Sequence, residues 1–193
     1  MGSKPFVKIT APTAADVCAH VELDEPARAL LDPAHTPQAY VGTLAGAQQW
    51  RDAARFLAFA LPPREAVWWA CLCARSVMSA ESAPIALAAL QAAEAWAYQP
   101  TEENRRGAEA AAMSDGALEH AAGWAAMSAF WSGGSLGPAE NPVVAPEPTL
   151  AAKAVQAALL IASVAEPPEQ EPERLQAFLA WGEDIAAGGD GSG

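Results

Sequence analysis

Alanine makes up about a quarter of this chain, and no other feature constrains the fold as strongly. Alanine is the best helix former, whereas the β-branched residues that favour strands are sparse and scattered. With 193 residues, the chain has the size of one ordinary domain built on one core. The sequence therefore predicts an all-α, single-domain bundle with few or no strands.

Prolines and glycines divide the chain into seven or eight short helical segments, because both residues interrupt helices. Thr13 or Asp16 can cap a brief first helix. The next segment, 38–61, is expected to form one long helix, with an interruption near Gly42 or Gly46 as the alternative. The later segments cover 64–78, 82–98, 101–113, 117–131, 149–164 and a C-terminal amphipathic helix. Short connections predict antiparallel hairpins, whose succession would resemble a solenoid.

One segment, REAVWWACLCARSVM at 64–78, is apolar on nearly every face, so we expect it at the centre of the bundle. The cysteines Cys18, Cys71 and Cys73 give no disulfide framework, and we expect them to pack as small apolar side chains. Four ranges follow from these patterns: an extended start with a short helix at 1–37, a helical core domain at 38–165, a linker with the amphipathic helix at 166–187, and a flexible tail at 188–193.

The formal net charge of −12 opposes attraction to phosphate backbones and anionic lipids, so we expect no nucleic-acid partner. The most apolar run, 150–165, contains Lys153 and is shorter than the ~20 residues that cross a bilayer, so we expect no membrane insertion. Residues 1–13 lack the continuous apolar core of a secretory signal. These features favour a cytoplasmic protein.

The stretch FWSGGSLG, residues 130–137, matches the G-x-S-x-G pattern of a hydrolase nucleophile elbow, with Ser135 as the serine. That elbow needs a strand before the serine, a helix after it and a later histidine, but here a helix precedes it and all three histidines come earlier. A helix end explains the pattern better, with Gly133 left-handed and Leu136 folded back onto the aromatic residues. The motif therefore favours a helix cap, and a turn beside Trp131 whose backbone a partner could reach.

Two carboxylates stand inside apolar helical segments, Glu65 beside a tryptophan pair and Glu94 on an apolar face. Burial of a carboxylate is costly unless it is paired, so we expect a buried ion pair with an arginine. The available arginines are Arg64, Arg75, Arg105 and Arg106. Glu65 and Glu94 are also the candidate catalytic pair of a hydrolase, although nothing in their spacing demands that role. No histidine or cysteine has metal-ligand spacing, so we expect no metal and no cofactor.

Four stretches, REAVWWACLCAR, AAEAWAYQPTEENRR, FWSGGSLGP and PTLAAKAVQAALLIA, together resemble an uncharacterised family of small helical bacterial proteins, a domain of unknown function. The resemblance covers Pro62 to Ala165 and leaves out the front end and the C-terminal helix. Members of that family look associated with type VI secretion gene clusters, where spike components and effectors need adaptors. No catalytic residue carries over from the resemblance.

Two classes of function remain open at this point. The first is a non-catalytic adaptor or chaperone for another protein, such as a type VI secretion effector or spike component, since tryptophan and arginine anchor interfaces well. Its expected partner-binding residues are Trp96, Trp131, Gly133, Gly134, Ser135 and Leu136. The second is a small hydrolase that uses Glu65 and Glu94. A secreted effector or a structural subunit would differ from the adaptor only in its final location. The sequence leaves the oligomeric state open.

Overall fold

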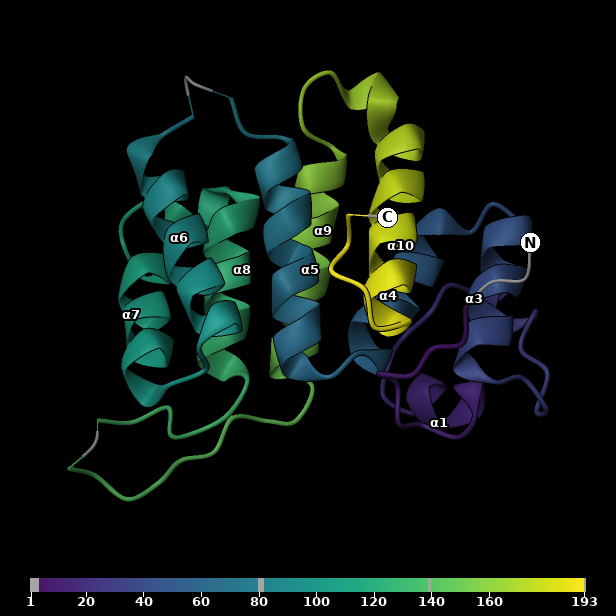
Figure 1. The fold of residues 1–193 in the computed structure, drawn as a ribbon, viewed down its shortest axis with the longest axis horizontal. Helices are drawn as coiled ribbons and strands as arrows, with labels where there is room; N and C mark the ends of the chain where they lie inside the picture. The colour runs from purple at the N-terminus through teal and green to yellow at the C-terminus, as the bar shows by residue number, and fades with distance from the viewer. Residues whose placement is uncertain (1–3, 80–81, 139, 193) are drawn as a thin grey trace. The chain divides into compact units, whose positions relative to one another are not determined.

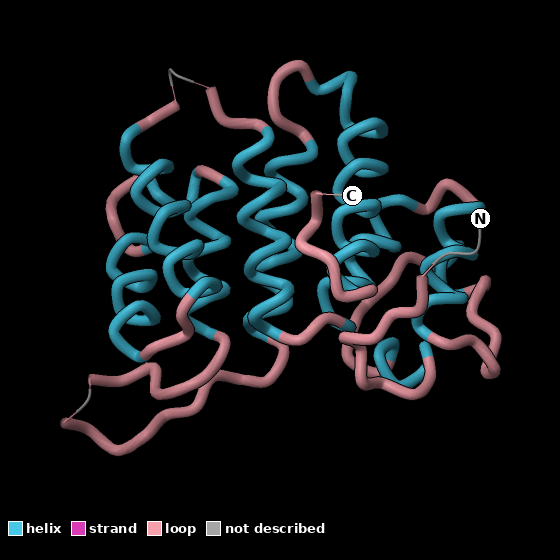
Figure 2. Tube along the Cα trace, in the orientation of Figure 1, coloured by secondary structure: helices cyan, strands magenta, loops and turns pink. Residues whose placement is uncertain are grey.

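The computed structural model describes residues 4–79, 82–138 and 140–192. In these residues it contains ten α-helices and two 3₁₀ turns, with no strand, so the all-α prediction is confirmed (Figure 1, Figure 2). Contacts between the helices divide them into two compact units. Unit 1 joins the two ends of the chain, Met1–Pro62 and Glu166–Gly193, and unit 2 is Pro63–Ala165. The boundaries between the units thus fall after Pro62 and after Ala165.

Unit 1 is built around helix α4, which contacts α1, α3 and α10. Its elements are α1 (Ala14–Cys18), α2 (Glu25–Arg28), α3 (Pro37–Gly46), α4 (Trp50–Ala60), the 3₁₀ turn η2 (Pro168–Gln170) and α10 (Glu171–Ala186). The extended N-terminal segment meets the end of α10, where the amide of Lys8 donates to the carbonyl of Ala186 at 2.9 Å. The two ends of the chain therefore pack in the same unit.

Local signals explain where the helices of unit 1 begin and end. Thr13 caps α1, since its hydroxyl oxygen accepts from the amide of Asp16 at 3.2 Å. The predicted segment 38–61 is interrupted between α3 and α4 by Gln48, which has a φ of 60°. The amide of Gln49 then donates to the carbonyl of Leu44 at 2.9 Å and closes the end of α3. The segment therefore forms two helices and not the one long helix expected, and the break comes just after Gly46, with a glutamine in the left-handed conformation.

The core of unit 1 contains Tyr40 and Phe56, whose rings meet edge to face with centroids 5.0 Å apart. The Tyr40 hydroxyl donates to the carbonyl of Ala27 at 2.7 Å, and burial raises the pKa of Tyr40 to about 12. At the other end of the unit, the amide of Gly191 donates to a carboxylate oxygen of Asp184 at 3.0 Å. Residues 188–192 of the glycine-rich tail, which the sequence marked as flexible, therefore contact α10 through hydrogen bonds to Asp184.

Unit 2 is a bundle whose central helix is α8. Its elements are α5 (Pro63–Ser76), α6 (Pro84–Tyr98), α7 (Glu102–Ala112), the 3₁₀ turn η1 (Ala117–Glu119), α8 (Ala121–Trp131) and α9 (Leu150–Ser163). Helix α8 contacts each of the other elements, including α5 and α6, which are not its neighbours in sequence. Unit 2 is therefore a bundle and not a solenoid, in which each repeat contacts only its neighbours.

Segment 64–78, expected at the centre, forms α5, which packs against α6, α8 and α9, while α8 contacts every other element of unit 2. A Cβ on Gly123 of α8 would lie 2.1 Å from the carbonyl oxygen of Ala117, so the backbones touch there. Cys71 and Cys73 of α5 are buried free thiols, as expected, and burial raises the pKa of both. In the part of the chain that the structure describes, no helix has both the length and the apolar character to cross a membrane.

Candidate functional site

The loop between α8 and α9, residues 132–149, includes the SGGSLG part of the FWSGGSLG motif and has no regular secondary structure in its described residues. It is the long pink segment at the lower left of Figure 2. Loops of this length are either disordered or functional in most compact proteins. Arginines from α7 hold this one in place, so we call it the clamped loop.

Arg105 of α7 is the main anchor, with only 4 % of its side chain exposed. Its guanidinium donates to the carbonyl of Phe130, the last turn of α8, at 2.7 Å and to that of Ser135 at 2.9 Å. It also forms two hydrogen bonds with the carboxylate of Glu102, at 2.6 and 2.7 Å. The buried arginine thus satisfies carbonyls that the end of α8 leaves without helical partners.

Arg106 adds a second attachment from the next position of α7. It donates to the carbonyls of Ser135, at 2.8 Å, and of Gly137. The guanidinium carbons of Arg105 and Arg106 lie 4.9 and 5.5 Å from the centre of the Phe130 ring, within range of cation–π attraction. Hydrogen bonding from Arg105, and then from Arg106, lowers the pKa of Glu102 to about 2. The clamp is therefore one connected network of charges and carbonyls.

Ser135 holds the turn of the clamped loop together. Its hydroxyl oxygen accepts from the amide of Gly137 at 3.2 Å and from the amide of Val144 at 3.1 Å. The amide of Leu136 donates to the carbonyl of Val144 at 2.8 Å, which brings the two limbs of the loop side by side. These contacts give Ser135 a structural role in the turn.

The left-handed residue of the motif is Gly134, with a φ of 67°, and not Gly133 as the sequence suggested. The shift arises because the helical backbone continues to Ser132, which has φ −74° and ψ −3°. A Cβ on Gly134 would lie 2.8 Å from the guanidinium of Arg105. Glycine is therefore required here both because Arg105 lies so close and because the backbone is left-handed.

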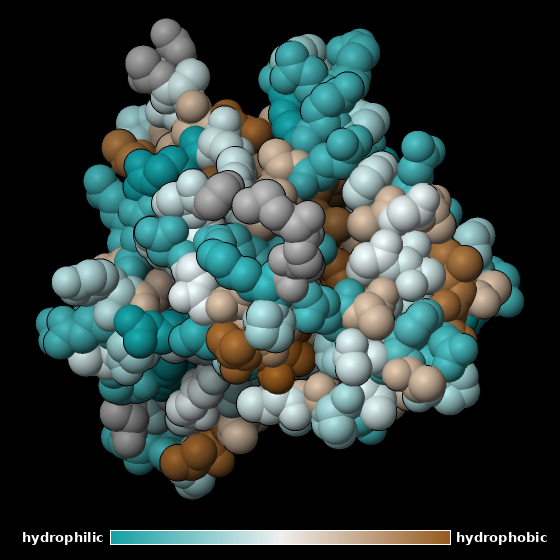
Figure 3. Space-filling model, turned by 45° about the vertical axis from the view of Figure 1, so that its right-hand side comes forward, coloured by the Kyte–Doolittle hydropathy of each residue, from teal (hydrophilic) through white to brown (hydrophobic). Residues whose placement is uncertain are grey.

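The second limb of the clamped loop is extended and faces solvent. Residues 140–145 are all exposed, and the side chains of Val143 and Val144 are 78 % and 55 % exposed. Hydrophilic residues cover much of the face in view in Figure 3, and the apolar residues gather in small separate groups. Two adjacent exposed valines on an anchored segment are therefore a distinct surface feature of unit 2.

The other expected partner-binding residues lie at different depths. Trp131, Gly133 and Leu136 are half-buried, whereas Gly134 is exposed. Trp96 is only 7 % exposed and belongs to the core of unit 2, so it offers no anchor for a partner. Trp96 stands close to the end of α6, and from that position the sequence could not show whether its side chain is buried in the core or exposed at the surface.

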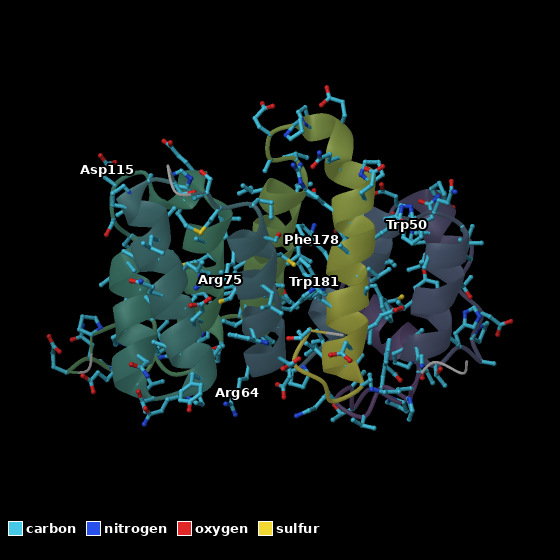
Figure 4. The ribbon with its side chains drawn as sticks, turned by 45° about the horizontal axis from the view of Figure 1, so that its top comes forward. Trp50, Arg64, Arg75, Asp115, Phe178 and Trp181 are labelled. Carbon is cyan, nitrogen blue, oxygen red and sulfur yellow. The ribbon has the colours of Figure 1, made fainter. Side chains whose placement is uncertain are left out.

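Glu65 and Glu94, the two carboxylates expected in a buried ion pair, lie in different surroundings. Glu94 pairs with Arg75 through hydrogen bonds of 2.6 to 2.9 Å, but the Arg75 side chain is 52 % exposed, so the pair lies at the surface (Figure 4). Glu65 is half-buried in the first turn of α5. Arg64 donates to the carbonyls of Ala97 and Tyr98 and caps the end of α6.

Of the six residues expected to form a buried ion pair, Arg105 is the one whose charged side chain is buried. Its carboxylate partner is Glu102, which was not among the six. Glu102 is 61 % exposed, so only one member of this pair is buried. The signal was present in TEENRR, where an acid in the first helical turn precedes two arginines by three and four positions. The sequence could not show that the end of α8 lies opposite this turn.

A pocket of about 240 Å³ in unit 1 was not anticipated from the sequence. It lies at the start of α4 and of α10, and its walls include Asp24, Trp50, Arg51, Asp52, Glu171 and Leu175. Arg51 closes one side through two hydrogen bonds to Glu171, at 2.6 and 2.7 Å. Within residues 4–79, 82–138 and 140–192, no group of three or more histidine, cysteine or acidic side chains is arranged to hold a metal ion.

Comparison with known proteins identifies a family but no activity. Residues 40–186 match the family of unknown function DUF6931, and the chain therefore belongs to that family. No curated protein and no solved structure matches the chain. The match extends beyond the segment Pro62–Ala165 of the earlier resemblance and includes α4 and α10, so the expectation that the C-terminal helix lies outside the family was wrong.

Proposed function

We propose that this member of DUF6931 is a non-catalytic adaptor or chaperone that binds another protein through the clamped loop. The observation that carries the proposal is the pair Val143 and Val144, which are exposed on a limb that is hydrogen-bonded at Val144 to Ser135 and Leu136. Arg105 and Arg106 in turn hold the carbonyl of Ser135. Exposed apolar side chains on an ordered segment are typical of recognition surfaces.

The clamp gives the proposal its energetic basis. A free loop must be ordered when it binds, and that ordering reduces the affinity. Arg105, Arg106 and Ser135 fix the limbs of this loop before any partner arrives. The extended backbone at 142–147 can then pair with an edge strand or enter an apolar groove, and the two valines supply apolar contact area.

The resemblance to proteins that look associated with type VI secretion gene clusters suggests which partners to test first. An effector or a spike component is the partner that we propose, with the adaptor acting in the cytoplasm. A secreted effector or structural subunit would use the same surface and differ only in location. The hydrolase alternative draws no support from the geometry of Glu94, whose carboxylate is bound by Arg75.

Affinity capture from the native host tests the proposal. The tagged protein is compared with Val143→Asp and with Val7→Asp, a matched variant in which an exposed valine of unit 1 receives the same charge; Val7 is 64 % exposed. We expect one partner at near-stoichiometric yield with the wild type and with Val7→Asp, and its loss with Val143→Asp. Equal recovery with all three proteins, or no partner at all, would contradict the proposal.

A further inference from the structure

The second limb of the clamped loop has a backbone edge that faces away from the first limb. The amide of Val144 donates to the hydroxyl oxygen of Ser135 at 3.1 Å, and its carbonyl accepts from the amide of Leu136 at 2.8 Å. Both backbone groups of Val144 therefore point toward the first limb. In an extended chain, the N–H and C=O groups of successive residues point to opposite sides. The backbone groups of Val143 and Ala145 consequently point away from the loop.

This outer edge, residues 143–145, is accessible and unpaired. Val143 and Ala145 are exposed, and neither forms a hydrogen bond with any of the described residues. Together they leave two amide donors and two carbonyl acceptors on one side of an extended segment. Such a row of unpaired backbone groups is a template on which another strand can pair.

The prolines of the second limb preserve this edge. Pro142 and Pro146 each lie two positions from Val144, so the amides that proline lacks are on the side of the first limb. Proline also favours an extended conformation of the residue before it, which in one case is Ala145. The two prolines therefore stiffen the limb and remove no donor from the outer edge.

We infer that the outer edge binds an extended strand of the partner protein through main-chain hydrogen bonds, the mode of recognition called β-strand addition. This inference rests on the function proposed for the clamped loop, and it selects the edge strand over the apolar groove as the structure that receives the loop. The four backbone groups of Val143 and Ala145 pair with the incoming strand.

The side chains and the charge of the chain narrow the choice of partner. Val143 and Val144 are adjacent in an extended segment, so their side chains project to opposite faces of the resulting sheet. Apolar side chains of the incoming strand can then pack on both faces. The net charge of −12 opposes pairing between two copies of this chain, so the strand belongs to another protein.

A peptide of defined sequence tests the pairing on the full chain. The probe is the acetylated and amidated peptide Lys-Thr-Val-Thr-Val-Lys, whose threonines and valines favour strands. The control is the same peptide N-methylated at its four central residues, which has the same charge and side chains but no amide donors there. Binding is followed by NMR, and we expect the first peptide to shift the amide signals of Val143 and Ala145 and not that of Val7. The N-methylated peptide should bind roughly tenfold more weakly or worse.

A variant at position 145 tests the edge from the side of this chain. Ala145→Pro removes one donor of the outer edge from a residue that is already extended, so the fold should persist while peptide affinity, measured at Val143, falls roughly tenfold. The matched control Ala145→Ser keeps the amide and should bind as the wild type does. Equal affinity of the wild type for both peptides, equal affinity of the two variants, or no response of Val143 to millimolar peptide would overturn the inference.

The affinity capture described above separates this inference from the function on which it rests. If a partner is lost with Val143→Asp but recovered equally with Ala145→Pro and Ala145→Ser, strand pairing is wrong while the binding function of the loop stands. If the wild type recovers no partner, the proposed function itself fails. Loss of the partner with Ala145→Pro, and its recovery with Ala145→Ser, is the result that we expect.

Discussion

Removal of the Arg105 side chain should destabilise unit 2 more than the loss of any surface arginine. In Arg105→Ala the carbonyl of Phe130 loses a charged donor, which contributes about 1.5–3 kcal/mol. The Ser135 carbonyl keeps its bond from Arg106, so its loss is smaller. The ion pair to the 61 % exposed Glu102 adds less than about 1 kcal/mol, and the contact with the Phe130 ring adds about 0.5–1 kcal/mol. The expected total is about 2–5 kcal/mol.

Urea titration followed by far-UV circular dichroism measures this loss. Arg28→Ala is the matched control, because Arg28 is 62 % exposed and pairs only with Glu25 in the same short helix; its free energy of unfolding should change by less than about 0.5 kcal/mol. Arg105→Lys keeps the charge but not the fork of donors and should lie between the two. A loss of less than about 1 kcal/mol in Arg105→Ala would refute the view that this buried arginine anchors the loop.

Three further predictions concern single positions. Gly134→Ala should destabilise unit 2 by about 2 kcal/mol or more in the same urea titration, because the left-handed backbone and the nearby Arg105 exclude a Cβ. Gly133→Ala is the control: the space around Gly133 is open, so its free energy of unfolding should change little. Because the pKa of Glu102 is lowered to about 2, its ionised form stabilises the fold fully above the unfolded pKa near 4.5, and this stabilisation is lost as the pH falls through about 2. In Glu102→Gln the free energy of unfolding should therefore depend less on pH between about 4.5 and 2 than in the wild type. Burial raises the pKa of Glu183, so its ionised form costs stability above that pKa, and Glu183→Gln should raise the melting temperature at pH 7 but not below pH 4.

Local features of the fold could be predicted from the sequence because neighbouring residues determine them. Thr101 caps α7 as its sequence context indicates, with its hydroxyl oxygen accepting from the amide of Asn104 at 3.2 Å. The helix ends at Pro62-Pro63 and at Gln99-Pro100 follow from the steric effect of proline on the preceding residue. These signals need no knowledge of the rest of the chain.

Two features could not be predicted from the sequence because they depend on residues that are distant along the chain: the contact of Arg105 with the end of α8, and the pocket of unit 1. Arg105 looked like a partner for Glu65 or Glu94, but it meets the carbonyl of Phe130, which is 25 positions away in the chain. The pocket needs Arg51 and Glu171, which lie 120 positions apart in two ends of the chain that form one unit. Helical periodicity gives the apolar face of each helix but not which helices meet. The spacing in TEENRR therefore indicated the pair of Glu102 and Arg105, but the contact of Arg105 with the end of α8 and the pocket had no sequence signature.

Site-specific photo-crosslinking at Val143 in the native host tests the central claim most directly. A benzoylphenylalanine side chain at this exposed position should crosslink one protein at high yield, and the same group at Val7 should not crosslink it. Combining the probe with Arg105→Ala should reduce the yield, because the loop is then no longer held in place. Absence of a specific product at position 143, or the same products at positions 143 and 7, would contradict the assignment of the clamped loop as a protein-binding surface.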